Sequence, residues 1–380
     1  MADRLTTPVY AIATHAASAL GLDTAAHWQR IIQLKGAIQQ HTDAAFSQAP
    51  FWASKIDPLQ WQHIRNHAGT GNALSPLEQL ALFSIKNALD QLENSLDTNE
   101  TILILSSTKG NIEWLNEKDN DRLLLGTSAN LIAQELGLKH TPIVVSQACI
   151  SGVVATLLAQ RLLQAGKYRQ AIVTGVDRFS KFVLNGFQSF HAIADAPCRP
   201  FDKNRSGINL GEAAGTIILS TQPTHPLAQL LSGSSTNDAN HISGPSRTGE
   251  ELALAIQQSL WAAGLQPNDI DLISAHGTAT LYNDEMESKA FGIAGVSNAP
   301  VHSIKGFTGH TLGAAGVLET ILLIEALRHQ LLIPSLGYQE MGTSQALTIP
   351  TTAQPATLTH ALKTASGFGG CNAAAIWKRV

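Results

Sequence analysis

Buried strands and amphipathic helices alternate along most of the chain. Short runs of β-branched and aliphatic residues predict strands, and longer stretches with apolar residues at helical spacing predict helices. In the first half, the pattern predicts helices after Asn130 and at 152–166, and strands at 101–108, 142–148 and 168–176. Such an alternation is typical of a layered α/β protein, in which helices cover the faces of a sheet.

The second half of the chain repeats this order in outline. Residues 221–248 are rich in Ser, Thr, Asn, Pro and Gly, so we expect a connecting region there. The pattern then predicts helices at 251–265, 284–292 and 313–331, strands at 269–277 and 301–305, and two closing strands around the GFGG sequence at 367–370. We therefore expect a duplicated α/β core, with a first half at 1–221 and a second half at 222–380.

The composition excludes several classes of protein. Of the 380 residues, 44% are hydrophobic and 14% are charged, a balance that favours a tightly packed globular protein over a disordered chain. The formal net charge of −4, without a cluster of Lys and Arg, argues against nucleic acid as the main partner. The N-terminal stretch lacks an apolar segment of signal-peptide or membrane-span length, so we expect a cytoplasmic protein with no membrane span.

Three cysteines raise the question of a nucleophile. Their number and spacing fit neither a secreted disulfide framework nor a zinc site. Cys149 ends a predicted strand just before a Ser-Gly pair that opens a predicted helix, and a helix N-terminus favours the reactive thiolate. A buried structural cysteine explains this stretch alone equally well. We expect Cys198 and Cys371 to be structural.

Three further motifs lie in loops of small residues. His276 begins the sequence HGTAT, and His310 lies within KGFTGHTLGAAG at 305–316. A lone histidine more often packs in the core or at the surface, but two histidines in such loops are candidates for chemistry. The GFGG turn lets the backbone approach a bound group, and its N–H groups could stabilise an oxyanion. An ordinary hairpin explains GFGG by itself.

Together, these motifs resemble those of the β-ketoacyl synthases, which are condensing enzymes. ACISG at 148–152 matches the family's nucleophile motif, and the two histidine motifs and GFGGCN follow in the family's order. CRPFDKNRSGINLGEAAG at 198–215 is similar to the family's connecting segment. SSTKGNIEWL at 106–115 is similar to ketosynthases of aryl-polyene or flexirubin-type pigment pathways. The resemblance implies a thiolase-like fold with a duplicated, five-layered α-β-α-β-α core.

The resemblance also implies a mechanism. Cys149 would accept an acyl group from a phosphopantetheine thioester, with the oxyanion held by N–H groups of Cys149 and Phe368. Gly369 would belong to the oxyanion hole and gate with Phe368. The carbonyl of a malonyl thioester would then lie between His276 and His310, whose N–H groups stabilise the enolate as carbon dioxide leaves. We expect no metal and no permanently bound cofactor, because phosphopantetheine arrives on an acyl carrier protein.

Further residues acquire roles only through the resemblance. Lys305 and Glu287 would form a buried ion pair beside the histidines, although an ordinary surface ion pair is plausible for either residue in isolation. Thr278 and Thr280 match hydroxyls that line the pantetheine route, but threonines in such a turn also satisfy local backbone groups. Phe368 would gate the acyl pocket, with a packed core aromatic as the alternative.

Two other functions compete with the elongating synthase. One is a thiolase acting on acyl-coenzyme A, with Cys149 and Cys371 both catalytic; the two histidine motifs and Lys305 argue against it. The other is a chain-length-factor-like subunit, which usually lacks the cysteine. The resemblance implies a homodimer, or a heterodimer with a chain-length factor, and leaves open the acyl-chain length and the choice among fatty acid, polyketide and aryl-polyene pathways.

Overall fold

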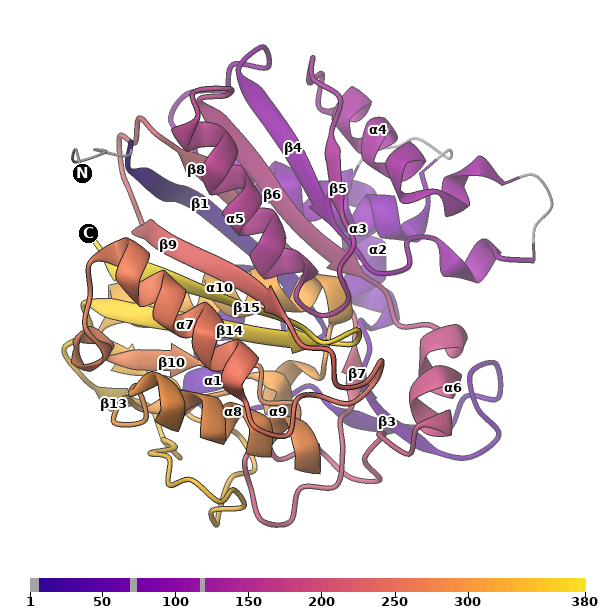
Figure 1. Ribbon diagram of the computed structural model, residues 1–380. Helices are drawn as coiled ribbons and strands as arrows, with labels where there is room; N and C mark the ends of the chain where they lie inside the picture. Colours follow the sequence, from indigo (N-terminus) through magenta and orange to yellow (C-terminus); the bar gives the residue numbers. More distant parts are fainter. Residues whose placement is uncertain (1–6, 69–73, 117–119) are drawn as a thin grey trace.

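The computed structural model describes residues 7–68, 74–116 and 120–380 (Figure 1). Its largest sheet has ten strands in the order β11-β10-β14-β15-β9-β1-β8-β6-β4-β5. These strands are β1 (Val9–Ser18), β4 (Thr101–Ser106), β5 (Ile143–Val145), β6 (Gln170–Asp177), β8 (Ala213–Ser220), β9 (Ala228–Asn237), β10 (Leu272–Ser274), β11 (Val301–His302), β14 (His360–Gly367) and β15 (Cys371–Arg379).

Helices and two small sheets complete the described structure. The helices are α1 (Thr24–Ile32), α2 (Pro58–Ala68), α3 (Pro76–Leu89), α4 (Leu125–Glu135), α5 (Ser151–Gln164), α6 (Lys181–Ser189), α7 (Glu250–Ala263), α8 (Leu281–Ala294), α9 (Lys305–Thr308) and α10 (Ala315–His329). The small sheets contain β2 (Gln39–His41), β3 (Phe51–Ser54) and β7 (Leu210–Gly211), and β12 (Leu331–Leu332) and β13 (Gln354–Pro355). Among the described residues, no helix is long and apolar enough to cross a membrane.

Local sequence signals set several helix ends. Ser75 and Glu78 form a capping box at the start of α3: the Ser75 hydroxyl accepts from the Glu78 N–H, and the Glu78 carboxylate accepts from the Ser75 N–H. At the start of α8, the Thr280 hydroxyl accepts from the Asn283 N–H. At the C-terminal end of α7, Gly264 adopts a left-handed conformation (φ 68°), which glycine tolerates best.

The two halves of the chain have the same topology. The first half orders its strands β1-β8-β6-β4-β5, and the second orders the equivalent strands β9-β15-β14-β10-β11. In each half, two parallel pairings at the outer edge are followed by two antiparallel ones toward the centre. The halves join where Val9–Ala11 pairs with Ala228–Leu230. This repeat confirms the predicted duplicated α/β core.

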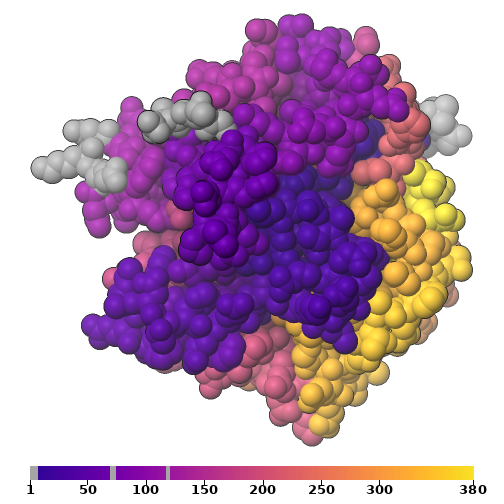
Figure 2. All heavy atoms as spheres, turned by 180° about the vertical axis from the view of Figure 1, so that it is seen from behind, coloured from indigo at the N-terminus to yellow at the C-terminus, as the bar shows by residue number. Residues whose placement is uncertain are grey.

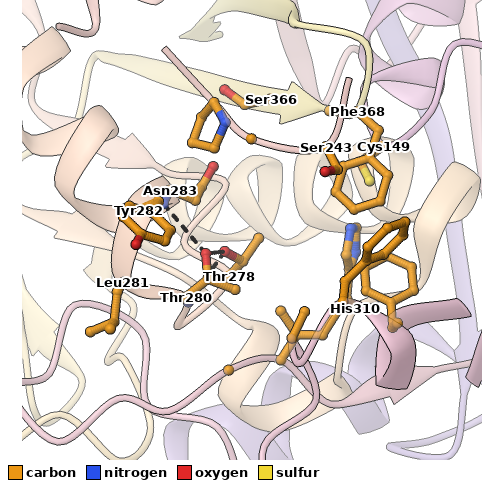
Figure 3. Close-up of a pocket in the computed structure, with 18 of the residues that line it drawn as sticks. Cys149, Ser243, Thr278, Thr280, Leu281, Tyr282, Asn283, His310, Ser366 and Phe368 are labelled. Carbon is orange, nitrogen blue, oxygen red and sulfur yellow. Dashed lines mark hydrogen bonds between the residues drawn. The ribbon is translucent and has the colours of Figure 1, made fainter. Parts of the chain in front are cut away.

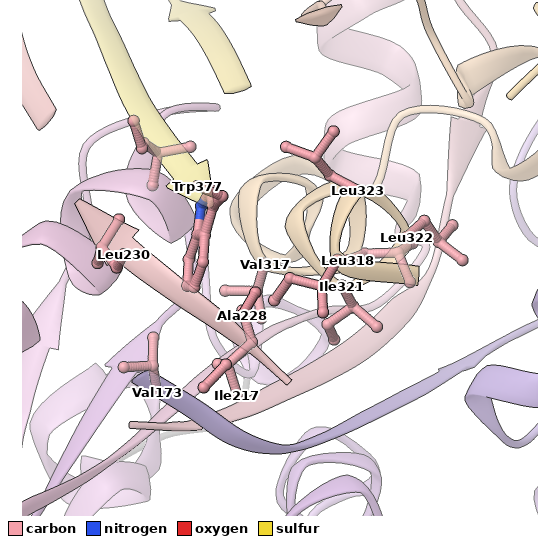
Figure 4. Close-up of a cluster of buried hydrophobic side chains, with 14 of the residues drawn as sticks. Val173, Ile217, Ala228, Leu230, Val317, Leu318, Ile321, Leu322, Leu323 and Trp377 are labelled. Atoms are coloured by element: carbon pink, nitrogen blue, oxygen red, sulfur yellow. The ribbon is translucent and has the colours of Figure 1, made fainter. Parts of the chain in front are cut away.

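Helices arrange the molecule in five layers. Helices α5 and α10 lie between the two half-sheets, while α3 and α4 cover the outer face of the first half and α7 and α8 that of the second (Figure 1). In the central layer, aliphatic side chains of α10 such as Val317 and Ile321 pack with Trp377 of β15 and Ile217 of β8 (Figure 4). Burial of such apolar side chains is the main favourable term in folding. The predicted five-layered core is therefore confirmed.

The N-terminal and C-terminal parts of the chain are packed into one body. Seen from behind, the indigo N-terminal residues lie beside the orange and yellow C-terminal residues (Figure 2). Trp28 of α1 stacks on His329 at the end of α10, with ring centroids 4.8 Å apart. Helix α10 therefore packs against the first half of the chain as well as the second.

Helices α5 and α10 cross at two glycines. A Cβ atom on Gly152 would lie 2.6 Å from the backbone nitrogen of Val317, and one on Gly316 would lie 2.6 Å from that of Val153. Both distances are far inside van der Waals contact, so only glycine permits this backbone approach. The crossing brings the start of α5, which follows Cys149, against the start of α10, which follows the His310 loop.

The structure contradicts two of the expected elements. Within the expected connecting region 221–248, β9 pairs with both β1 and β15. The polar side chains of β9 do not predict a strand from the sequence. The strand is stabilised by pairing with these neighbours rather than by local propensity. The strand expected at 301–305 ends at His302, and Lys305 begins the short helix α9. The division at 221/222 lies between β8 and β9 and stays a prediction.

The helix crossing yields a prediction about stability. Replacing Gly152 with alanine inserts a methyl group between two backbones, so we expect the free energy of unfolding to fall by about 1–3 kcal/mol. Gly126→Ala on α4 is the matched control, because no described atom lies within 4 Å of a Cβ there. The midpoint of thermal unfolding should drop for Gly152→Ala and stay level or rise for Gly126→Ala. An unchanged midpoint for Gly152→Ala would contradict the packing described.

Candidate active site

A sharp turn before α5 presents Cys149. Ala148 has a positive φ of 44°, an uncommon conformation for a residue with a side chain. The Ser151 hydroxyl fixes the turn, since it donates to the Ala148 carbonyl (2.6 Å) and accepts from the Gln147 N–H (2.7 Å). The turn puts Cys149 at the N-terminus of α5, buried but lining a cavity.

Cys149 is one of the residues that line a cavity, many of which are drawn in Figure 3. The volume of this cavity is about 380 Å³, within the range of small-molecule sites. Cys149, His310 and Phe368 lie at one end, and the exposed side chains of Leu281 and Tyr282 lie at the other. This shape suits an elongated ligand whose reactive end reaches Cys149.

The two histidines of the sequence motifs meet Cys149 at the inner end. His276 follows β10 and His310 follows α9, so both come from the second half of the chain, whereas Cys149 comes from the first. The rings of His276 and His310 are 5.1 Å apart and nearly perpendicular. The Cys149 sulfur and one nitrogen of each ring all lie within 4.8 Å of one another. The fold thus brings together the three residues that the motifs select.

Hydrogen bonds fix which nitrogen of His310 carries the proton. The Leu312 N–H donates to Nδ1 of His310 at 3.3 Å, so Nδ1 is the acceptor of a neutral ring. The proton then lies on Nε2, a buried atom that has no hydrogen-bond partner among the described residues. His310 therefore offers an N–H donor to a group bound in the cavity.

The same reasoning orients His276. The Lys305 ammonium lies 3.3 Å from Nδ1 of His276 and also donates to the His276 carbonyl. An ammonium group can only donate, so Nδ1 accepts and the proton lies on Nε2. Burial, reinforced by the charge of Lys305, holds the pKa of both histidines well below the usual value of 6.5. Both rings are therefore neutral N–H donors near neutral pH.

Lys305 pairs with Glu319 rather than with Glu287, which corrects the expected ion pair. The distance from Lys305 Nζ to Glu319 Oε1 is 2.5 Å, and both side chains are buried. Glu287 on α8 instead accepts from the backbone N–H groups of His276 (2.8 Å) and Gly277 (2.6 Å). Its oxygens are occupied in holding the His276 loop. Two glutamates, Glu319 and Glu325, interrupt the apolar sequence of α10, and this interruption is the sequence signal that could have found the missed residue Glu319.

The GFGG loop lies directly over the cysteine. A Cβ on Gly367 would lie 3.0 Å from the Cys149 nitrogen, so glycine allows the loop to reach this backbone group. Phe368 is 37% exposed and stacks on Phe187 of α6, with ring centroids 5.3 Å apart. Gly369 adopts a left-handed φ of 83°, and its N–H donates to the Ile242 carbonyl at 2.7 Å. Gly369 therefore shapes the turn rather than supplying an oxyanion donor, contrary to expectation.

Thr278 and Thr280 line the cavity between Cys149 and its mouth. Their hydroxyl oxygens are 2.9 Å apart, and that of Thr280 also accepts from the Asn283 N–H to cap α8. The two hydroxyls thus satisfy local groups, as one of the two expectations holds, and their contact with a pantetheine chain stays a prediction. The thiols of the other two cysteines are buried and donate to backbone carbonyls, that of Cys198 to Lys305 and that of Cys371 to Phe368.

Comparison with known proteins decides the family. The family model described as "Beta-ketoacyl synthase, N-terminal domain" matches residues 7–225, and that described as "Beta-ketoacyl synthase, C-terminal domain" matches residues 227–339. The chain belongs to the β-ketoacyl synthase family. The predicted family membership is confirmed, and the two models divide the chain between β8 and β9.

Individual relatives of this β-ketoacyl synthase agree with the assignment. The 3-oxoacyl-[acyl-carrier-protein] synthase 2 of Mycobacterium leprae is 31% identical over 313 residues, which cover 73% of this chain and 74% of the relative. A putative polyketide beta-ketoacyl synthase 1 of Streptomyces cyaneus is 31% identical over 66% of this chain and 63% of its own length. The solved complex of the ketosynthase ApeO with its chain length factor ApeC, from Xenorhabdus doucetiae, has a chain that matches with a TM-score of 0.85 at 25% identity, over 100% of both chains.

Burial sets the protonation state of the nucleophile Cys149 in this synthase. It raises the pKa of the Cys149 thiol to about 12, although the charge of Lys305 acts in the opposite direction. A helix N-terminus typically contributes about 1 kcal/mol, which is less than one pKa unit. Burial therefore outweighs the helix N-terminus, which by itself favours the thiolate, and the balance of the two favours a neutral Cys149 thiol near neutral pH.

This raised pKa predicts how Cys149 reacts with iodoacetamide. Because only the thiolate reacts, its alkylation rate should rise about tenfold per pH unit between pH 7 and 10, without a plateau. Intact-mass measurement of wild type beside Cys149→Ala separates this reaction from that of Cys198 and Cys371. A plateau below pH 8.5 would mean a stabilised thiolate and would contradict the electrostatics described here.

Proposed function

We propose that the protein elongates acyl chains by decarboxylative Claisen condensation of an acyl group on Cys149 with malonyl-acyl carrier protein. It is an acyltransferase of the 3-oxoacyl-[acyl-carrier-protein] synthase type, and its product is a β-ketoacyl chain on the carrier. The observation that carries the proposal is the meeting of one thiol and two imidazole N–H donors at the inner end of one cavity. Each group has a distinct part in the reaction.

The first half-reaction loads the enzyme. The Cys149 sulfur bonds to the acyl carbonyl carbon, the bond from that carbon to the pantetheine sulfur breaks, and the thiol proton ends on the departing pantetheine. In this proposal the N–H groups of Cys149 and Phe368 stabilise the tetrahedral oxyanion, which the closeness of Gly367, the residue before Phe368, to the Cys149 nitrogen supports. Because the resting thiol is neutral, proton transfer accompanies the attack and no free thiolate is needed beforehand.

The second half-reaction forms the carbon–carbon bond. The malonyl thioester carbonyl accepts hydrogen bonds from Nε2–H of His276 and Nε2–H of His310. Loss of carbon dioxide leaves an enolate whose negative charge these donors stabilise. The enolate carbon attacks the acyl carbonyl, the bond to the Cys149 sulfur breaks, and the sulfur takes up a proton. Neutral donors suit this step because a charged imidazolium, a stronger acid, would protonate the enolate before its carbon could attack.

Substrates reach Cys149 along the cavity on a phosphopantetheine arm. Thr278 and Thr280 line this route. We propose that the chain needs no metal and no permanently bound cofactor, since the carrier protein delivers the arm. Thiol and imidazole groups this close together also suit Zn²⁺. A bound ion would occupy the nucleophile and block acylation, so zinc should inhibit the reaction.

We also propose that the chain works as the ketosynthase subunit of a dimer in the cytoplasm. Strand β5 lies at one edge of the large sheet, where a second subunit could extend it. The solved ApeO–ApeC complex pairs a ketosynthase with a chain length factor, and an ishigamide ketosynthase/chain length factor structure matches with a TM-score of 0.88 at 24% identity. A second copy of this chain or a chain-length-factor-like subunit is the partner. The three free cysteines suit a reducing compartment.

Each rival function meets an obstacle in the site. A thiolase would need Cys371 as a catalytic group, but this thiol donates to the Phe368 carbonyl and is not among the residues that line the cavity. A chain-length factor would not need the nucleophile, yet Cys149 is present between two histidine donors. The pigment-type pathway suggested by SSTKGNIEWL remains part of the proposal.

Intact-mass spectrometry tests the proposed reaction. Purified protein is incubated with acyl-carrier protein and then malonyl-carrier protein, with Cys149→Ala as the control and with chelator or Zn²⁺ in parallel samples. We expect acylation of wild type alone, a carrier-bound product two carbons longer, no effect of chelator and inhibition by zinc. Activity with acetyl-coenzyme A alone, together with its loss in Cys371→Ser, would favour a thiolase. Acylation only of an added partner subunit would favour a chain-length factor.

A further inference from the structure

A second lysine is buried beside the histidines and has no part in the mechanism above. Lys363 of β14 is fully buried, with 0% of its surface exposed. Its ammonium group donates to the carbonyls of Ser274 (3.1 Å), Ala275 (3.3 Å) and Thr364 (2.7 Å). Isolated buried ammonium groups are strongly unfavourable, so these partners are needed to hold the charge inside the protein.

Lys363 holds the segment that leads into His276. In the sheet, Lys363 of β14 lies opposite Ser274 of β10 in parallel register. The two β10-side carbonyls that it binds belong to the residues immediately before His276. These two peptide groups set the position of the backbone at His276. The Lys363 ammonium group therefore fixes the start of the loop that carries His276.

Lys363 also reaches His276 through a chain of charges. Its Nζ lies 2.7 Å from Glu319 Oε2, while Glu319 Oε1 lies 2.5 Å from Lys305 Nζ. Lys305 in turn donates to Nδ1 of His276. Glu319 therefore bridges two cations with its two oxygens, so its orientation depends on both.

We propose that Lys363 is a positioning residue for the decarboxylative half-reaction: it clamps Glu319 and the end of β10 so that Lys305 keeps the Nε2–H group of His276 aimed into the cavity. This inference rests on the proposed function. It assigns Lys363 no part in loading Cys149, because none of its contacts touches the cysteine turn or the GFGG loop. The two half-reactions should thus depend differently on this side chain.

The neighbours of Lys363 also indicate what its loss would do to stability. Removing one partner of a buried ion pair is strongly destabilising, because it leaves the other charge uncompensated. Glu319 would still keep its ion pair with Lys305, which limits this loss. We therefore expect Lys363→Met, which has a similar length, to fold with a lower thermal unfolding midpoint. Lys363→Gln is a second variant that keeps a hydrogen-bond donor and loses the charge.

Separate rates for the two half-reactions test this inference. Acylation of Cys149 is followed by intact mass, and release of labelled carbon dioxide from malonyl-carrier protein is followed on the acylated enzyme. For Lys363→Met we expect an unchanged acylation rate and a release of carbon dioxide slower by about tenfold or more, since small displacements of catalytic groups cost rate steeply. Lys378→Met, at the exposed end of the neighbouring strand β15, is the matched control and should match wild type in both steps.

The outcomes separate this inference from the proposed function. Folded variants that release carbon dioxide at the wild-type rate, or that lose both steps equally, would overturn the positioning role while the proposed function stands. Failure of both the Met and Gln variants to fold would make Lys363 a structural residue and overturn the role as well. If wild type neither acylates nor releases carbon dioxide, the proposed function itself fails.

Discussion

Backbone contact between α5 and α10 is the constraint on which the site depends. The helices come from equivalent places in the two halves, and Gly152 and Gly316 let them approach until a Cβ on either would collide with the other backbone. Cys149 lies just before one helix and His310 just before the other. The distance between a nucleophile from one half and a histidine from the other is therefore fixed by packing in the most buried layer of the protein, not by flexible loops.

A second level of organisation is electrostatic. The inner end of the cavity holds neutral reacting groups, because burial raises the pKa of the thiol and lowers that of both histidines. The charged groups do not line the cavity: Glu319 pairs with Lys305 and Lys363 behind the histidines. In the proposed mechanism, charged groups that do not line the cavity orient the neutral donors, and the site stabilises an enolate without a group that would protonate it.

The sequence alone was sufficient for residues that lie in continuous motifs and insufficient for those joined only by folding. Cys149, His276 and His310 stand out because each lies in a short stretch of small residues, and the alternation of elements predicted the duplicated core. The partner of Lys305 was misassigned to Glu287, since no local pattern pairs one buried charge with another and only packing brings Glu319 to Lys305. Strand β9 was missed because its polar residues pair with strands from distant parts of the chain, and the raised pKa of Cys149 depends on burial that no local pattern reveals.

The central claim is that His276 and His310 act as neutral Nε2–H donors whose state is fixed by the fold. Two-dimensional ¹⁵N–¹H spectra of protein labelled at histidine, assigned with the single variants His276→Ala and His310→Ala, test it directly between pH 8 and 5.5. The account predicts that both rings keep the shifts of the neutral Nε2–H tautomer across this range, because burial holds their pKa well below 6.5. Titration of either ring near pH 6.5, or a proton on Nδ1, would contradict it.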